Sequence, residues 1–231
     1  MCPLTRLAAS ICFAASLPAL WLPAAFAADD PYWPGTDDSW ETVSPAEAGM
    51  DSDQLNTALA FAMENASHGV VVLRGGRIVG ERYANGWSHQ TTRDMFSAQK
   101  SVSSVLIGIA LERGLIRDLD APAAELLTEW KETPKAKITV KHLLSMTSGL
   151  FSSKRSDLFQ HMRAKDKTAF ALALDQVHGP GTRWAYNNPA YGLVVELEKR
   201  ASGKSRQAFA AEALFDPLGM TRSRCALLKV G

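Results

Sequence analysis

Apolar and polar positions along the chain first predict one helix and one hairpin. Within residues 52–66, apolar side chains such as Leu59 and Met63 recur at helical spacing, which predicts an amphipathic helix. Two β-rich runs follow, at 70–73 and 78–83, on either side of a Gly-Gly turn. This pattern is typical of a β-hairpin.

Beyond Met95 the pattern becomes helical. Val102 and Leu106 belong to an apolar stripe that predicts a mostly buried helix over about 97–113, and Gly114 follows as its stop. Further helices are predicted over 121–130, 140–147, 168–177, 190–201 and 205–215. An isolated hairpin is marginal in water, so we expect an α/β (α+β) fold whose sheet needs strands beyond these two.

The first 27 residues differ from the rest of the chain. Arg6 is their only charged side chain, 7–26 is almost wholly apolar, and the stretch closes with Ala25-Phe26-Ala27. We interpret 1–27 as a secretory signal peptide. A membrane anchor is the alternative, but two prolines interrupt the apolar run. We therefore expect a periplasmic or secreted bacterial protein with no stable membrane anchor after cleavage.

Composition excludes several classes of function. The chain is 46% hydrophobic and 21% charged, as expected for a globular protein with a sizeable core. Its 25 Lys and Arg residues nearly balance its 24 Asp and Glu residues, which argues against a nucleic-acid partner. Cys225 is the one cysteine beyond the leader, so no internal disulfide is expected. The histidines lack metal-ligand spacing, and we expect neither a metal nor a cofactor.

The strongest candidate for chemistry is Ser97-Ala98-Gln99-Lys100 at the start of the buried helix. Residues three apart share a helix face, so the Lys100 amine can reach the Ser97 hydroxyl and form a nucleophile beside a base. A helix N-terminus also favours developing negative charge. The spacing alone arises by chance about once in a chain of this length, and a simple N-cap serine with a solvated lysine is the alternative.

A second candidate is Tyr186-Asn187-Asn188. A free lysine has a pKa of about 10.4, so a neutral Lys100 is scarce at pH 7 unless a neighbour shares its proton. Tyr186 could form that coupled pair with Lys100, and Asn188 could hold the substrate and the lysine. The alternative is that Tyr186 is an ordinary core aromatic residue.

Together these motifs resemble the serine β-lactamase and penicillin-binding-protein superfamily. Between them lies Leu143-Leu144-Ser145-Met146-Thr147-Ser148-Gly149-Leu150, and Pro180-Gly181-Thr182-Arg183-Trp184 leads into the tyrosine. The chain is most similar, over about 51–222, to the class C-like branch of esterases and 6-aminohexanoate-dimer hydrolases. The resemblance implies Ser97 as the acylated nucleophile, Lys100 as its proton partner, Tyr186 as general acid/base and Asn188 as a substrate contact.

The chain departs from the family pattern at two points. The histidine usual before Thr147 is Met146 here, so we interpret that segment as structural. The Lys-Thr-Gly or His-x-Gly strand expected well beyond the tyrosine has no match, and Lys229-Val230-Gly231 lies too near the tyrosine to serve. We therefore expect a β-lactamase-like antiparallel sheet with a helical domain, whose C-terminal strands are missing from this sequence.

The expected domain organisation has five parts. It comprises the signal peptide at 1–27, an extended lead-in at 28–50, a helix-plus-hairpin part of the sheet domain at 51–95, a helical domain at 96–222 and a truncated tail at 223–231.

The predicted function is that of an exported serine hydrolase that acts on a small-molecule ester, amide or β-lactam through an acyl-enzyme on Ser97. The alternative is a catalytically inactive relative that binds cell-wall peptides or acyl ligands. No feature of the sequence indicates an oligomeric state.

Overall fold

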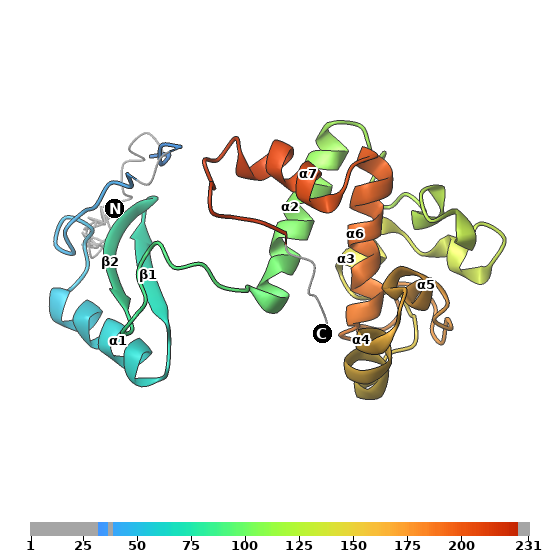
Figure 1. Ribbon diagram of the computed structural model, residues 1–231, viewed down its shortest axis with the longest axis horizontal. Helices are drawn as coiled ribbons and strands as arrows, with labels where there is room; N and C mark the ends of the chain where they lie inside the picture. Colours follow the sequence, from blue (N-terminus) through green and yellow to red (C-terminus); the bar gives the residue numbers. More distant parts are fainter. Residues whose placement is uncertain (1–31, 37–38, 226–231) are drawn as a thin grey trace, which may run out of the picture.

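The computed structural model describes residues 32–36 and 39–225 (Figure 1). The predicted signal peptide at 1–27 lies outside the described residues, as do 226–231 of the predicted tail. In Figure 1 the elements labelled α1, β1 and β2 stand on one side and a larger set of helices on the other. We call the first, α1 with β1 and β2, the hairpin unit, and the second, residues 96–225, the helical body.

The hairpin unit forms where the apolar pattern predicts it. Helix α1 spans Ser52–Glu64, and the Asp51 side chain caps it by accepting from the N–H groups of Asp53 and Gln54 at 2.9 and 2.8 Å. Strand β1 (Gly69–Arg74) pairs antiparallel with β2 (Arg77–Tyr83). The predicted helix and hairpin are therefore confirmed.

The lead-in adds a contact that the sequence pattern does not predict. Thr42 forms an isolated parallel bridge with Ile78 of β2. The Ile78 N–H donates to the Glu41 carbonyl and the Ile78 carbonyl accepts from Val43 N–H, each at 2.9 Å. The free edge of β2 is thus partly covered by residues without strand-like alternation.

The helical body is built from two long helices and several short ones. Helix α2 spans Gln99–Glu112 after a 3₁₀ turn, η1, at Phe96–Ala98, and α6 spans Asn188–Ser202. The other elements are η2 (Ala123–Glu125), η3 (Thr128–Trp130), η4 (Pro134–Lys137), α3 (Val140–Leu144), η5 (Ser156–Gln160), α4 (His161–Arg163), α5 (Lys167–Leu172), α7 (Arg206–Ala210) and η6 (Ala211–Phe215).

The core of the helical body lies between α2 and α6, which run close together in Figure 1. Leu106 and Ile107 of α2 and Leu193 and Leu197 of α6 are fully buried. Such side chains each contribute about 1.5–3 kcal/mol on burial, so this cluster holds α2 and the residues at its start.

Four predicted helices are wrong in extent or type. The helix predicted over 140–147 ends at Leu144. Residues 121–130 form the two 3₁₀ turns η2 and η3, because the Ala123 N–H donates to the Ile138 carbonyl at 2.8 Å and Pro122 bridges Thr139 instead of entering a helix. The predicted helix at 168–177 ends at Leu172. The helix predicted over 205–215 changes from α7 into the π-helical η6.

The two parts are joined by residues 84–95, which carry no helix or strand. Among the described residues, no helix has the length and apolarity that a bilayer crossing requires.

Candidate active site

Ser97 lies in η1, two residues before Gln99, the first residue of α2, and its side chain is exposed. The preceding residue, Phe96, has a φ of 45°. A bulky side chain with positive φ is strained, and such strain persists only where surrounding contacts impose it. The predicted helix start is therefore a strained 3₁₀ turn that presents Ser97.

The structure brings three of the four predicted residues into direct contact. Ser97 Oγ lies 2.7 Å from the Tyr186 hydroxyl, although the two residues are 89 positions apart. The Lys100 ammonium donates to Ser97 Oγ at 3.0 Å. Lys100 Nζ also lies 5.2 Å from the centre of the Tyr186 ring. The Ser97 hydroxyl thus forms hydrogen bonds with both Tyr186 and Lys100.

Residues 143–150, which we interpret as a structural segment, support the loop that carries Tyr186. The Met146 carbonyl accepts from Ala185 N–H at 3.1 Å, and the Thr147 carbonyl accepts from Gly181 N–H at 2.8 Å. Gly149 has a φ of 75°, and a Cβ there would collide with the His178 carbonyl. Only glycine fits this close approach.

Asn188 is the first residue of α6, where the helix is capped twice. Its N–H donates to Asp157 Oδ2 at 3.1 Å, and the preceding Asn187 accepts from Ala190 N–H at 3.0 Å. No hydrogen bond joins the Asn188 side-chain amide to Ser97, Lys100 or Tyr186. Its role toward a substrate stays a prediction.

Two further side chains support the site and were missed from the sequence. The Tyr191 hydroxyl donates to the Lys100 carbonyl at 2.8 Å, and Lys100 Nζ lies 5.5 Å from the centre of the Tyr191 ring. Ser152 Oγ donates to the Tyr186 carbonyl at 2.9 Å. Tyr191 lies one helical turn after Asn188, but nothing in its spacing indicates contact with Lys100.

The site favours loss of the Tyr186 proton. Hydrogen bonding with Ser97 and then with Lys100 lowers the pKa of Tyr186 below its ordinary value, and this outweighs the opposing effect of burial. Tyr186 is nonetheless 43% exposed, and Phe96 and Trp184 are exposed nearby in the chain. The reactive hydroxyls are therefore open to a substrate from solvent.

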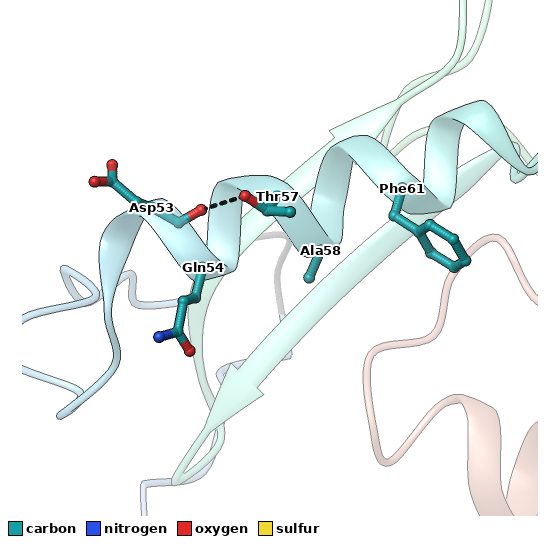
Figure 2. A pocket seen from close by; sticks show the side chains of 5 residues that line it. All are labelled: Asp53, Gln54, Thr57, Ala58 and Phe61. Atoms are coloured by element: carbon teal, nitrogen blue, oxygen red, sulfur yellow. Dashed lines mark hydrogen bonds between the residues drawn. The ribbon is translucent and has the colours of Figure 1, made fainter.

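Other parts of the described structure offer less chemistry. No group of His, Cys, Asp and Glu side chains within 32–36 and 39–225 is arranged to hold a metal ion. A surface hollow of about 490 Å³ lies along α1 and is lined by Asp53, Gln54, Thr57, Ala58 and Phe61, whose side chains are drawn in Figure 2. It contains none of the predicted site residues.

Comparison with known proteins gives a family match and partial relatives. Residues 54–227 match the family described as Beta-lactamase. The esterase/beta-lactamase LipL of Mycobacterium tuberculosis is 30% identical over an alignment of 139 positions that covers 57% of this chain and 30% of LipL. Monacolin J acid methylbutanoyltransferase of Aspergillus terreus is 30% identical over an alignment of 151 positions that covers 54% of this chain and 36% of the relative. The chain thus spans about a third of these relatives.

Solved structures show the same fold over most of the chain. A candidate beta-lactamase from Bacteroides dorei is 26% identical, with a TM-score of 0.63 over 74% of this chain and 52% of its own. The octameric penicillin-binding protein homologue from Pyrococcus abyssi is 23% identical, with a TM-score of 0.60 over 74% of this chain and 44% of its own. The β-lactamase-like fold predicted from the sequence is confirmed.

Proposed function

Because the chain belongs to the beta-lactamase family, we propose that it is a serine hydrolase that forms an acyl-enzyme on Ser97. One observation carries the proposal: Ser97 Oγ is hydrogen-bonded to both Tyr186 and Lys100. A nucleophilic hydroxyl within reach of two proton-transfer groups is the arrangement that covalent acyl transfer requires. A structural N-cap serine needs neither partner.

The contacts support a division of labour between the two proton-transfer groups. An ammonium only donates hydrogen bonds, so Ser97 Oγ accepts from Lys100. The Ser97 hydroxyl proton is then available to Tyr186. The lowered pKa of Tyr186 favours the phenolate that accepts this proton. Lys100 then stabilises the negative charge that Tyr186 and Ser97 share.

The reaction proceeds in two steps, acylation of Ser97 and hydrolysis of the acyl-enzyme. Ser97 Oγ attacks the acyl carbon while its proton passes to Tyr186, and the carbonyl oxygen becomes an oxyanion beside the start of α2, where the helix dipole and the Ser97 N–H favour negative charge. Tyr186 returns the proton to the leaving alcohol or amine, and the acyl-enzyme forms. Water then attacks the acyl-enzyme ester while Tyr186 accepts a proton from the water. Tyr186 passes this proton to Ser97 Oγ as the acid is released.

The substrate class is an ester, an amide or a β-lactam. The name of LipL combines esterase and beta-lactamase, which supports this range. The match to a methylbutanoyltransferase favours a second candidate, in which an alcohol replaces water as the acyl acceptor. A non-catalytic binder of acyl ligands is the remaining alternative. In all three cases Asn188 is proposed to contact the substrate.

Covalent labelling tests the proposal. The purified chain is treated with a fluorophosphonate and, separately, with a fluorescent penicillin, and the adduct is mapped by peptide mass spectrometry. An adduct on Ser97 is expected. A folded chain that remains unlabelled by both reagents favours the non-catalytic binder. Adding a short alcohol during turnover of an aryl ester distinguishes the transferase, since a new ester then accumulates in place of the acid.

We further propose that the protein acts outside the cytoplasm, on the basis of the apolar leader and its Ala-Phe-Ala end. Expression of the full chain with cell fractionation tests this. The exported form should begin after Ala27 by N-terminal sequencing, and an uncleaved cytoplasmic product would contradict the proposal.

A further inference from the structure

A buried acid and a largely buried base lie behind the nucleophile helix. Glu198 of α6 is 0% exposed, and neither of its carboxylate oxygens has a hydrogen-bond partner in the described structure. Arg206, the first residue of α7, places Nε 3.8 Å from Glu198 Oε2, and the arginine side chain is 16% exposed. Burying such a pair costs desolvation energy, so it rarely serves stability alone.

Arg206 also reaches across to α2. One of its terminal nitrogens donates to Gln99 Oε1 at 2.7 Å and to Ser103 Oγ at 2.8 Å. Gln99 and Ser103 are one helical turn apart, and Gln99 stands between Ser97 and Lys100 in the sequence. A planar guanidinium that bonds two successive turns fixes the rotation of a helix about its axis more firmly than one contact does.

The same end of α2 is held from a second direction. Tyr191 donates to the Lys100 carbonyl at 2.8 Å, so the adjacent residues Gln99 and Lys100 are bound by α7 and α6 respectively. These contacts lie directly after the strained Phe96, whose φ of 45° must be imposed by its surroundings.

We propose that Arg206, anchored by Glu198, is a positioning residue that sets the orientation of the first turns of α2 and thereby places Lys100 Nζ and Ser97 Oγ for acyl transfer. The inference rests on the proposed serine chemistry for its kinetic consequence. Its structural part, the fixing of α2, stands without that chemistry.

The variants are chosen to separate positioning from stability. Arg206→Met alone would leave Glu198 buried and unpaired, which is strongly destabilising. The double variant Glu198→Leu/Arg206→Met removes both charges and should fold. Gln99→Met removes one of the two acceptors that α2 offers to Arg206 and keeps the ion pair, whereas Gln99→Glu keeps that acceptor. Arg200→Met is the matched control, because Arg200 also pairs with acids, Glu129 of η3 and Glu196 of its own helix, and neither of these lies on α2.

The first measurement is the saturating rate of fluorophosphonate labelling, together with the half-saturating concentration. Displacing reacting groups by about 1 Å costs about a hundredfold. Gln99→Met and the double variant should therefore lose about tenfold to a hundredfold in the saturating rate, with half-saturation unchanged. Gln99→Glu should restore most of the rate, and Arg200→Met should leave it unaltered.

The second measurement is amide hydrogen exchange over α2 in the same full-length variants, which needs no reactivity. Selective loss of protection in the first turns of α2 is expected for Gln99→Met and the double variant. Wild-type protection and wild-type labelling in both would overturn the inference. If wild-type protein does not label at all, the proposed chemistry fails, and the exchange pattern alone supports or overturns the positioning of α2.

Discussion

The helical body consists of helices and helical turns and the hairpin unit of one helix and two strands, and the two also differ in how their side chains are buried. In the helical body, α2 and α6 share fully buried side chains such as Leu106 and Leu197. In the hairpin unit, Leu59 and Val79 are buried, while Phe61 is 65% exposed and Val71 46% exposed. A two-stranded hairpin with one covering helix lacks the second layer that would enclose its apolar side chains.

This difference shows where the site gets its rigidity. The described residues that form or support the candidate site all come from the helical body, and α2, which begins two residues after Ser97, contributes to its core. Precise placement of a nucleophile requires packed supports, and the hairpin unit contributes no hydrogen bond to Ser97, Lys100 or Tyr186. We therefore expect the two regions to respond differently to substitution.

The largest effect is expected at the nucleophile. Ser97→Ala should abolish covalent labelling without changing helix content, because no other atom at that position can form the acyl bond. Intact mass spectrometry and circular dichroism measure the two properties. Ser101→Ala, at an exposed serine on the next turn of α2, is the matched control. A surviving adduct on the Ser97→Ala protein would place the nucleophile elsewhere.

The next largest effect concerns the proton-sharing pair. Lys100→Ala and Tyr186→Phe should each reduce the acylation rate strongly, and the double variant should resemble the slower single variant, because groups that share one proton act as a unit. Stopped-flow labelling of the four proteins measures this. Losses that simply multiply would show that the two side chains act independently.

The comparison of regions is sharpened by core substitutions. Leu197→Ala should destabilise the helical body by about 2–5 kcal/mol, as expected for a large-to-small change in a packed core, and labelling of Ser97 should fall in parallel with unfolding. Leu59→Ala should loosen the hairpin unit and leave labelling in place. Urea titration followed by labelling and by hydrogen exchange separates the two. Equal loss of labelling in both variants would contradict the expected difference between the two regions.

A smaller effect is expected from pH at Glu198. Burial raises its pKa to about 7, against the opposing influence of Arg206 and then of Ser103. The folded state therefore holds this proton more tightly than the unfolded state, in which the pKa is near 4.5. The contribution of Glu198 to the free energy of unfolding is therefore fully present below pH 4.5 and is lost as the pH rises through 7. The expected loss between pH 5 and 8 is on the order of 2 kcal/mol.

Glu198→Gln should remove that slope, and urea unfolding at pH 5, 6, 7 and 8 tests it. Arg206 and the Tyr191 phenol face this carboxyl from α7 and from its own helix. Burial raises the pKa of Tyr191 above its ordinary value, so this phenol does not contribute to the slope. A wild-type slope that persists in Glu198→Gln would assign the pH dependence to another group.

The smallest effect on stability is expected on the exposed face of the hairpin unit. Phe61→Glu, in the hollow shown in Figure 2, and Val71→Lys should change the free energy of unfolding by about 0.5 kcal/mol or less, as is usual at exposed positions. Both should reduce self-association, because they interrupt exposed apolar surface. Light scattering at several concentrations measures this. A large loss of stability in either variant would show that these side chains are packed in solution.

Local features of the fold were predictable because they depend on neighbours in sequence. The capping of α1 by Asp51 and the termination of α6 at Gly203, which has a φ of 66°, follow from backbone sterics and hydrogen bonds within one turn. The hairpin around Gly75-Gly76 has the same origin. The segment 121–130 was mispredicted because its backbone hydrogen-bonds to Ile138, a partner outside any local pattern.

The sequence by itself determined the candidate residues and the local elements that carry them, including the one-turn spacing of Ser97 and Lys100. Only the tertiary structure decided that Tyr186, 89 positions away, reaches Ser97 at 2.7 Å, that Thr42 covers an edge of the hairpin, and that Glu198 is buried beside Arg206. The physical reason is that a helix or turn is specified by sterics and hydrogen bonds within a few residues. Contacts between distant segments depend on which apolar faces pack together, and that choice is made by the whole core.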